Sequence, residues 1–306
     1  MLLHFPGGID VQQRLGFWRA LRVRSTTVLT TAASALAAIL VPAPLAALPS
    51  LNVRRAAQPV AEPALWMLRD VDTTIYLFGT FHALDASSDW FGRNVRAAFD
   101  SSDQLILETL VPTDPIDLTN ALIRHALVAV PKVGQPVAAG GSVQVSAFAA
   151  SARQAMAAGR SAGMTVDRGA DAVLRSIADS EGKPVSGLES FDFQLAMFTG
   201  LPSPAPAPAA NAPPVDPKQL MIDLRAAWER GDSAGFAAVL GTLETQSPVA
   251  YRRLFVDRNA DWASWIARRM GQPGTVFVAV GTGHLIGRDS VQQQLASRGY
   301  RTTRIY

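Results

Sequence analysis

Two copies of a Gly-Thr-x-His motif contain the residues of this chain that are best suited to chemistry. GTFH covers residues 79–82 and GTGH covers residues 281–284, and each copy follows an apolar run. Together they account for two of the four histidines in 306 residues. Composition makes even one such match improbable, so the pair indicates shared chemistry or shared ancestry.

Each motif has the residue types of a loop that presents an imidazole. Gly79 and Gly281 can leave a strand through backbone angles that other residues avoid. Thr80 and Thr282 can then hydrogen-bond the turn. A single histidine in such a turn is usually structural, whereas two at equivalent positions favour a shared function.

The two imidazoles, His82 and His284, would form a metal site if a carboxylate lay beside them. Glu108 is the best placed, because it directly follows a short buried-strand pattern, Leu-Ile-Leu. Such a donor set suits a divalent Zn, Mn, Fe or Co. Glu108 could instead be the general base that activates water at the metal, or an exposed acid at a strand end.

A helical stripe nearer the C-terminus places a cation on a buried face. Arg258 lies four residues from both Leu254 and Trp262, which are apolar residues of the same predicted helix. A buried guanidinium requires an anion, which could be Glu108, a substrate carboxylate, a developing oxyanion or a purely structural partner. Asn259 beside it is a secondary candidate.

The other polar candidates have simpler explanations. Glu189 is predicted to begin a helix, where the macrodipole favours a carboxylate, and it is a secondary candidate. His125 lies within a predicted helix and is expected to be structural. Asp85 and Asp89 follow His82 in a loop, where acids mostly face water.

The elements that must position these residues alternate between strand and helix. The patterns predict a β-hairpin over 64–70 and 73–79, a helix over 91–99 and a buried strand over 104–108. The second motif has a similar setting, with a strand over 275–280, a helix over 288–298 and a strand over 300–306. Because ligands gather beyond the carboxyl ends of strands in α/β sheets, His82, Glu108 and His284 should share one edge.

We therefore expect an α/β fold with a central mixed sheet. The sheet is predicted to consist of two pseudo-symmetric strand-GTxH-helix-strand halves, with a largely helical insertion between them. Within the insertion the patterns predict helices over 116–130, 145–160, 170–181, from 189, over 218–231 and over 248–270, and a short strand in KPVSGL. Seven prolines in residues 201–217 predict a polyproline-like surface loop.

The N-terminus has the layout of an export signal. Four arginines precede an uncharged run that ends in alanines and prolines, so residues 1–47 are predicted to be a signal peptide. The alternative is an uncleaved membrane anchor, although residues 26–41 are shorter than the roughly 20 residues that span a bilayer. A polar spacer over 48–62 and a domain over 63–306 would follow.

Composition limits the partners and the compartment. Removal of residues 1–47 would take four Arg and one Asp and leave 24 basic and 24 acidic residues, without a basic run that suits nucleic acid. The absence of cysteine excludes disulfides, thiolate metal sites and a cysteine nucleophile. Together with the excess of Arg over Lys, these features favour a bacterial periplasmic or secreted protein, attached to a membrane only if the signal is uncleaved.

Several stretches resemble the TraB/GumN proteins, which belong with PrgY and the Tiki proteases. They are ALWMLRD, YLFGTFHAL, LILET, GKPVSGLESFDFQLAMF, DRNADWASWI and VAVGTGHLIGRDSVQQQLASRGY. The resemblance implies two GxxH motifs, a Glu and an Arg that act together, here matching His82, His284, Glu108 and Arg258. It also implies a fold similar to erythromycin-esterase-like and ChaN-like proteins, and the Tiki branch implies proteolysis with Mn or Co. The proline-rich segment 201–217 departs from the family pattern.

The sequence thus favours an exported metal-dependent hydrolase, a peptidase that acts on a peptide or protein substrate. His82 and His284 would hold the metal, and Glu108 would bind it or take a proton from water. Arg258 would orient Glu108 or stabilise an oxyanion. The alternatives are a non-catalytic protein that sequesters a peptide and a haem- or iron-binding protein of the ChaN-like type.

Overall fold

The computed structural model describes residues 61–125, 147–201 and 216–306. The predicted signal segment 1–47 lies outside the described residues, as does nearly all of the spacer 48–62 and of the proline-rich segment 201–217. None of the helices within the described part of the chain is long and apolar enough to cross a membrane.

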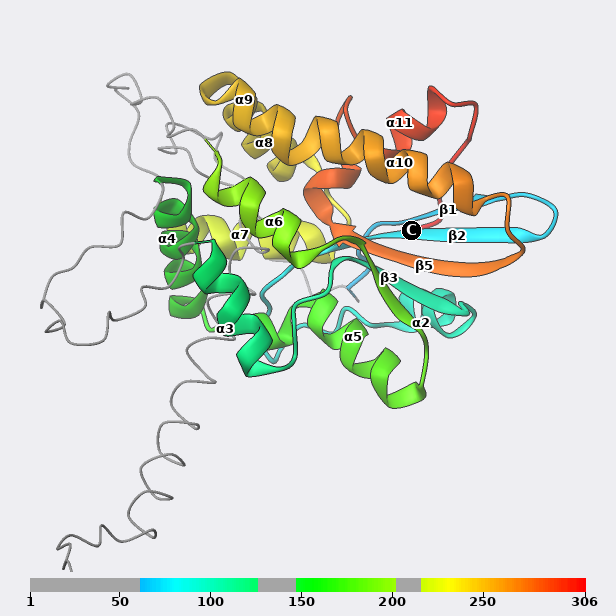
Figure 1. The fold of residues 1–306 in the computed structure, drawn as a ribbon, viewed down its shortest axis with the longest axis horizontal. Helices are drawn as coiled ribbons and strands as arrows, with labels where there is room; N and C mark the ends of the chain where they lie inside the picture. Colours follow the sequence, from blue (N-terminus) through cyan, green and yellow to red (C-terminus); the bar gives the residue numbers. More distant parts are fainter. Residues whose placement is uncertain (1–60, 126–146, 202–215) are drawn as a thin grey trace, which may run out of the picture.

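A six-stranded mixed sheet, in the order β4-β3-β5-β2-β1-β6, forms the centre of the fold (Figure 1). The strands are β1 (Leu65–Arg69), β2 (Thr73–Thr80), β3 (Gln104–Thr109), β4 (Val185–Glu189), β5 (Gly274–Gly281) and β6 (Thr303–Arg304). Neighbours from β4 to β2 pair in parallel, and β1 pairs antiparallel with β2 and with β6. The predicted hairpin and buried strands are confirmed, but the strand predicted over 300–306 is only two residues long.

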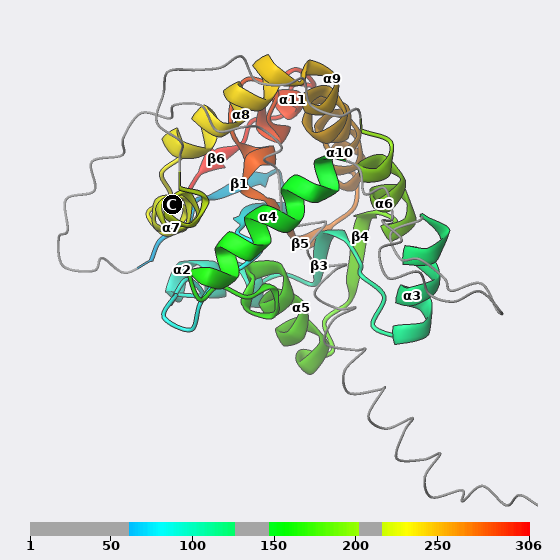
Figure 2. The same cartoon turned by 90° about the vertical axis from the view of Figure 1, so that its left-hand side faces the viewer.

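Helices cover both faces of this sheet. On one face lie α2 (Arg93–Asp100) and α5 (Ala170–Glu181), and on the other lie α10 (Asp257–Arg269) and α11 (Val291–Ala296) (Figure 1). Beyond the carboxyl ends of the parallel strands lie α3 (Pro115–Arg124), α4 (Ala147–Ser161), α6 (Phe191–Thr199), α7 (Pro217–Glu229), α8 (Ala234–Gln246) and α9 (Pro248–Tyr251) (Figures 1 and 2). The structure thus shows an α/β fold, and α8 is a helix that the sequence patterns did not predict.

Alternation along β5 explains why both helical layers pack tightly. Val276, Val278 and Val280 belong to the core beneath α10 and α11, and Phe277 and Ala279 belong to the core beneath α2 and α5. Because both faces are buried, the strand consists of a continuous apolar run, as is typical of parallel sheets.

The parallel pairing of β2 with β5 brings the two Gly-Thr-x-His motifs to the same edge, since Thr80 pairs with Gly281. Beyond the motifs the two units differ. The unit after β2 continues through α2 to β3, which lies next to β5, whereas the unit after β5 continues through α11 to the short β6 next to β1. The expected pseudo-symmetry of two equivalent halves is therefore not confirmed.

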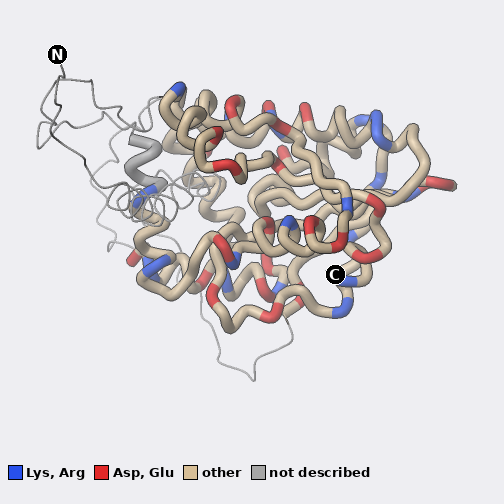
Figure 3. The backbone as a smooth tube through the Cα atoms, turned by 60° about the horizontal axis from the view of Figure 1, so that its bottom comes forward, with Lys and Arg blue, Asp and Glu red and all other residues tan. Residues whose placement is uncertain are grey.

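Charged residues of both signs are interspersed along the described backbone (Figure 3). Exposed pairs such as Arg124 with Asp192 stabilise a fold only slightly, because water screens them. His125 also contacts Asp192, at 3.1 Å, in keeping with a structural role at the end of α3. Asp85 pairs with Arg225 and not with the groups near His82.

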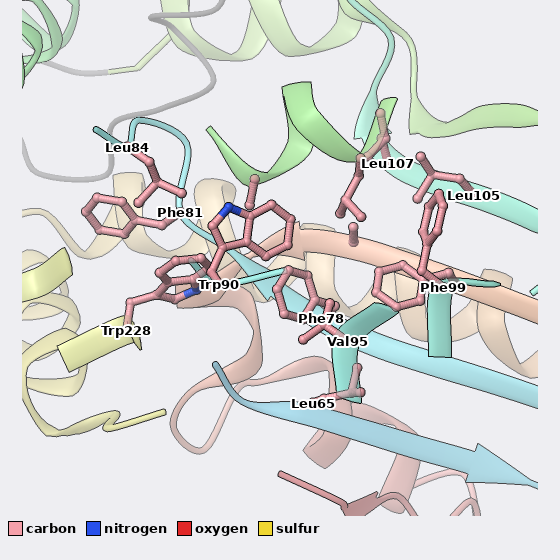
Figure 4. Packing of buried hydrophobic residues seen from close by; sticks show 14 of the residues in the cluster. Leu65, Phe78, Phe81, Leu84, Trp90, Val95, Phe99, Leu105, Leu107 and Trp228 are labelled. Carbon is pink, nitrogen blue, oxygen red and sulfur yellow. The ribbon is translucent and has the colours of Figure 1, made fainter. Parts of the chain in front are cut away.

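An aromatic cluster that includes Phe81, Trp90 and Trp228 packs against the first motif (Figure 4). The ring of Trp228, from α7, lies 5.8 Å from that of Trp90 and 5.9 Å from that of Phe81. Its indole Nε1 donates a hydrogen bond of 2.7 Å to the Gly79 carbonyl. Packing and hydrogen bonding at Trp228 thus fix the backbone at the start of the motif.

We expect Trp228→Phe to lower the free energy of unfolding by about 2 kcal/mol, because it opens a cavity and leaves the buried Gly79 carbonyl without its donor. Chemical denaturation would measure the loss. Trp265→Phe is the matched control, since Trp265 is only partly buried, and it should cost clearly less. Equal losses in the two variants would contradict the assigned role of Trp228.

Candidate functional site

The first motif and the end of β3 direct polar atoms at one small space beside Gly281. A side-chain carbon at Gly281 would lie 2.9 Å from both His82 Nε2 and Glu108 Oε1. The Gly281 N–H donates to Glu108 Oε1 at 2.5 Å. His284 Nε2 lies 3.7 Å from the same oxygen. The structure therefore brings His82, His284 and Glu108 together, and a glycine at 281 leaves the room for them to meet.

The two motifs also pack against each other through their other residues. A side-chain carbon at Gly79 would lie 2.8 Å from Thr282 Oγ1. That hydroxyl instead donates to the Thr80 carbonyl at 3.0 Å. Gly79, Thr80 and Thr282 therefore hold the two loops in contact, and neither Gly79 nor Thr282 supplies the converging atoms.

Arg258, from α10, joins the carboxylates that end two neighbouring strands. Its Nε and Nη2 donate to the two oxygens of Glu189 at 2.7 and 2.9 Å. Nη2 also donates to Glu108 Oε2 at 3.1 Å. Arg258 is 3% exposed and Glu108 is 8% exposed, so Glu108 is not a solvent-facing acid. The buried cation expected from the helical stripe is thus present, with two anions as partners.

The prediction that Glu189 begins a helix is wrong. Glu189 instead ends β4, where it pairs in register with Thr109, and Ser190 caps the helix that follows. At this strand end Glu189 has buried partners, including the indole N–H of Trp262, which donates to its Oε1 at 2.9 Å. Burial raises the pKa of Glu189, and the charge of Arg258 opposes that rise.

His284 is held in one orientation by Asn259. The Asn259 amide N–H donates to the Asp289 carbonyl at 2.7 Å, so its oxygen accepts from His284 Nδ1 at 2.6 Å. The lone pair of His284 Nε2 then faces Arg258 Nη1 at 3.2 Å. Burial, followed by the charges of Arg258 and His82, places the pKa of His284 well below its usual value. This imidazole is therefore neutral at physiological pH.

A π turn over Arg252–Val256 interrupts the helix that was predicted to run through 248–270. Asp257 N–H donates to the Arg252 carbonyl in this turn. Within it, the Leu254 carbonyl accepts from Arg258 Nη1 at 3.2 Å. Such turns are rare and often occur at functional sites, and periodicity alone does not reveal them.

His82 has a partner that the sequence reasoning missed. Its Nδ1 lies 2.8 Å from Asp171 Oδ1, and its Nε2 is buried with no hydrogen-bond partner among the described residues. Burial favours the neutral ring, but Asp171 outweighs it and raises the pKa of His82 to about 9. The local signal for Asp171 was weak, because an acid in the first turn of a helix usually has a local role.

A comparison with protein families tests the resemblance noted above. The TraB/PrgY/gumN family model matches residues 64–129 and 116–304. The chain belongs to the TraB/PrgY/gumN family. The matched residues include both Gly-Thr-x-His motifs, as well as Glu108 and Arg258. A search of curated proteins and a search of solved structures gave no match.

The donor types of this family member fit a divalent metal, but they are not yet arranged as a complete site. In the described part of the chain, no group of three or more His, Cys, Asp or Glu could hold a metal ion as it stands. The 3.7 Å between His284 Nε2 and Glu108 Oε1 is close to the roughly 3.4 Å between two tetrahedral ligands with bonds of about 2.1 Å. Among the described residues, His82 Nε2 has no competing hydrogen-bond partner. Full ligation would require Arg258 Nη1 to release His284 Nε2.

Replacing Arg258 with lysine should lower the free energy of unfolding by about 3 kcal/mol, because one ammonium cannot satisfy both buried carboxylates. Arg252→Lys on the preceding turn is the control, since Arg252 forms an exposed pair with Asp257 and its replacement should cost under about 0.5 kcal/mol. Urea denaturation of both variants would measure the difference. If Arg258→Lys lowered the free energy of unfolding as little as Arg252→Lys does, the result would contradict the buried ion pairs of Arg258 with Glu108 and Glu189.

The raised pKa of His82 also predicts a pH dependence for the metal-free protein. Since the folded-state pKa is about 9 and the unfolded value is 6.5, the contribution is complete below pH 6.5 and is lost as the pH rises through 9. It amounts to at most about 3 kcal/mol. Denaturation with a chelator at several pH values should show a steeper decline for the wild type than for His82→Gln. Parallel curves would exclude a stabilising charge on His82.

Proposed function

We propose that this TraB/PrgY/gumN family member is a metal-dependent hydrolase, and more narrowly a peptidase. One observation carries the proposal: His82 Nε2 and Glu108 Oε1 face the same space beside Gly281, with His284 Nε2 3.7 Å from that carboxylate. His82, His284 and Glu108 would hold a divalent Mn, Co, Zn or Fe.

The charges around the site support a divalent cation. Glu108, Glu189 and Asp171 supply three negative charges and Arg258 supplies one positive charge. In the metal-free protein a proton on His82 leaves these groups with a net charge of −1. Once His82 gives up that proton to act as a ligand, the same buried or half-buried groups sum to −2, and a divalent cation would neutralise that charge.

The residues around the site would share the work of hydrolysis. A bound metal would supply Lewis acidity towards a scissile carbonyl and towards water. Glu108 would either complete the set of metal ligands or act as the general base that takes a proton from water, and the Gly281 N–H and Arg258 hold its two oxygens in either role. Arg258 would also offer positive charge to a developing oxyanion, and Glu189 would keep the guanidinium in place.

We also propose that the protein is exported from the cytoplasm. An N-terminal signal would direct the hydrolase to the periplasm or to the exterior, where its peptide or protein substrate would be found. The intact mass of the exported product should then lack about 47 residues. A full-length product retained in the membrane would establish the anchor instead.

Metal analysis and a peptide-library cleavage assay on the exported protein test the function. The wild type should bind Mn or Co and cleave peptides, and His82→Ala and His284→Ala should lose both properties. Glu108→Gln should lower cleavage by about 100-fold or more. The matched control is His125→Ala, because His125 pairs with the exposed Asp192 and not with Glu108, His82 or His284; it should behave as wild type.

The other outcomes separate the alternatives. Equal metal content in the wild type and both site variants would defeat the metal assignment. Cleavage that survives the double histidine substitution would defeat the catalytic assignment. Metal binding without cleavage would favour a peptide-sequestering protein, and a Soret absorption band would favour haem.

A further inference from the structure

The N-terminus of α5 packs directly against the first motif. The Ala170 N–H donates to the Phe81 carbonyl at 3.0 Å. Residues just before α5 add two more bonds, because Leu84 and Thr165 exchange backbone hydrogen bonds of 3.1 and 2.8 Å. The loop that carries His82 is thus held by the segment that leads into α5.

This contact depends on a glycine. A side-chain carbon at Gly169 would collide with the backbone carbonyl of His82. The backbone of Gly169 has φ −56° and ψ 150°, which other residues adopt readily, so the requirement is for space alone. Without a side chain at 169, α5 can approach closely enough for Asp171 to reach the imidazole.

The approach fixes which nitrogen of His82 points inward. Asp171 Oδ1 contacts Nδ1 at 2.8 Å, and Nε2 therefore faces the space shared with Glu108 beside Gly281. His284 has the same arrangement, with Nδ1 held by Asn259 and Nε2 directed inward. A histidine that binds a metal commonly uses one nitrogen as ligand and donates the other N–H to an oxygen.

We propose that Asp171 is a positioning residue for His82, and that Gly169 is what allows α5 to deliver it. The assignment rests on the proposed function, because it gives Asp171 a role in metal binding through His82. Asp171 itself touches neither metal nor substrate. It holds the ring so that Nε2 is presented to the site.

Nitrogen-15 NMR of the histidine rings in the metal-free protein tests the orientation directly. The chain has only four histidines, and His82→Gln identifies the resonances of His82. Asp171→Ala should shift the ring nitrogens of His82 and leave those of His284 and His125 unchanged. Asp192→Ala is the matched control, since it removes the carboxylate beside His125 and should shift His125 alone.

Mn²⁺ affinity, followed by the EPR signal of the free ion, tests the consequence. Asp171→Ala should weaken binding by about 10- to 100-fold. Asp171→Asn keeps an oxygen acceptor and should lose less. Gly169→Ala keeps the carboxylate but displaces α5, and it should reproduce both the NMR shift and the loss of affinity. Gly241→Ala, where no described residue beyond the helix's own backbone lies within 4 Å of the added carbon, should match the wild type.

Circular dichroism establishes that each variant is folded. If the wild type binds Mn²⁺ and Asp171→Ala binds it equally well with unchanged His82 resonances, the positioning role is wrong and the proposed function stands. If the wild type binds no metal, the proposed function fails, and the role of Asp171 in metal binding fails with it. The NMR comparison would then still decide whether Asp171 orients the ring.

Discussion

The site depends on a guanidinium buried between two carboxylates. Arg258 lies on α10, and its partners Glu108 and Glu189 end the neighbouring strands β3 and β4. A buried charge is tolerated only when its hydrogen bonds are satisfied, so the helix must keep its position over both strand ends. Leu254 in the preceding π turn and Trp262 and Ile266 on α10 are buried in the core and hold the helix there. Packing and ion pairing therefore require the same placement.

Glycine determines how closely the strands can present these groups. Glu108, His82 and the backbone of Gly281 come from three adjacent strand ends, and hydrogen is the only substituent that fits at 281 without displacing both side chains. In the other motif, Gly79 makes room for Thr282 in the same way. The repeated Gly-Thr-x-His thus reflects two loops that leave adjacent parallel strands and contact each other, and it does not require two equivalent halves.

The sequence predicted the parts of the site that follow strong local patterns. His82, His284 and Glu108 each come just after an apolar run, and Arg258 interrupts an apolar helical stripe, so period and position sufficed to find them. Asp171 is 89 residues from His82, and no local pattern links the two residues. The place of Glu189 at the end of β4 was equally hidden, because it depends on contacts with Arg258 and Trp262 that only the folded chain provides. Local patterns predict which side chains reach the carboxyl edge of the sheet, whereas tertiary contacts decide how each side chain is oriented there.

The two imidazoles have unlike partners, and Arg258 lies within hydrogen-bond distance of His284. The guanidinium lies 3.2 Å from His284 Nε2, so a positive charge on that ring would be repelled, and the neutral amide of Asn259 is a sufficient partner. His82 has the carboxylate of Asp171, which favours a proton on the ring in the metal-free protein. Metal ligation requires neutral imidazoles. Under the proposed function, His284 already has a neutral ring and needs only to be released by Arg258 Nη1, whereas His82 must first release a proton, so any coupling of metal binding to pH would act mainly through His82.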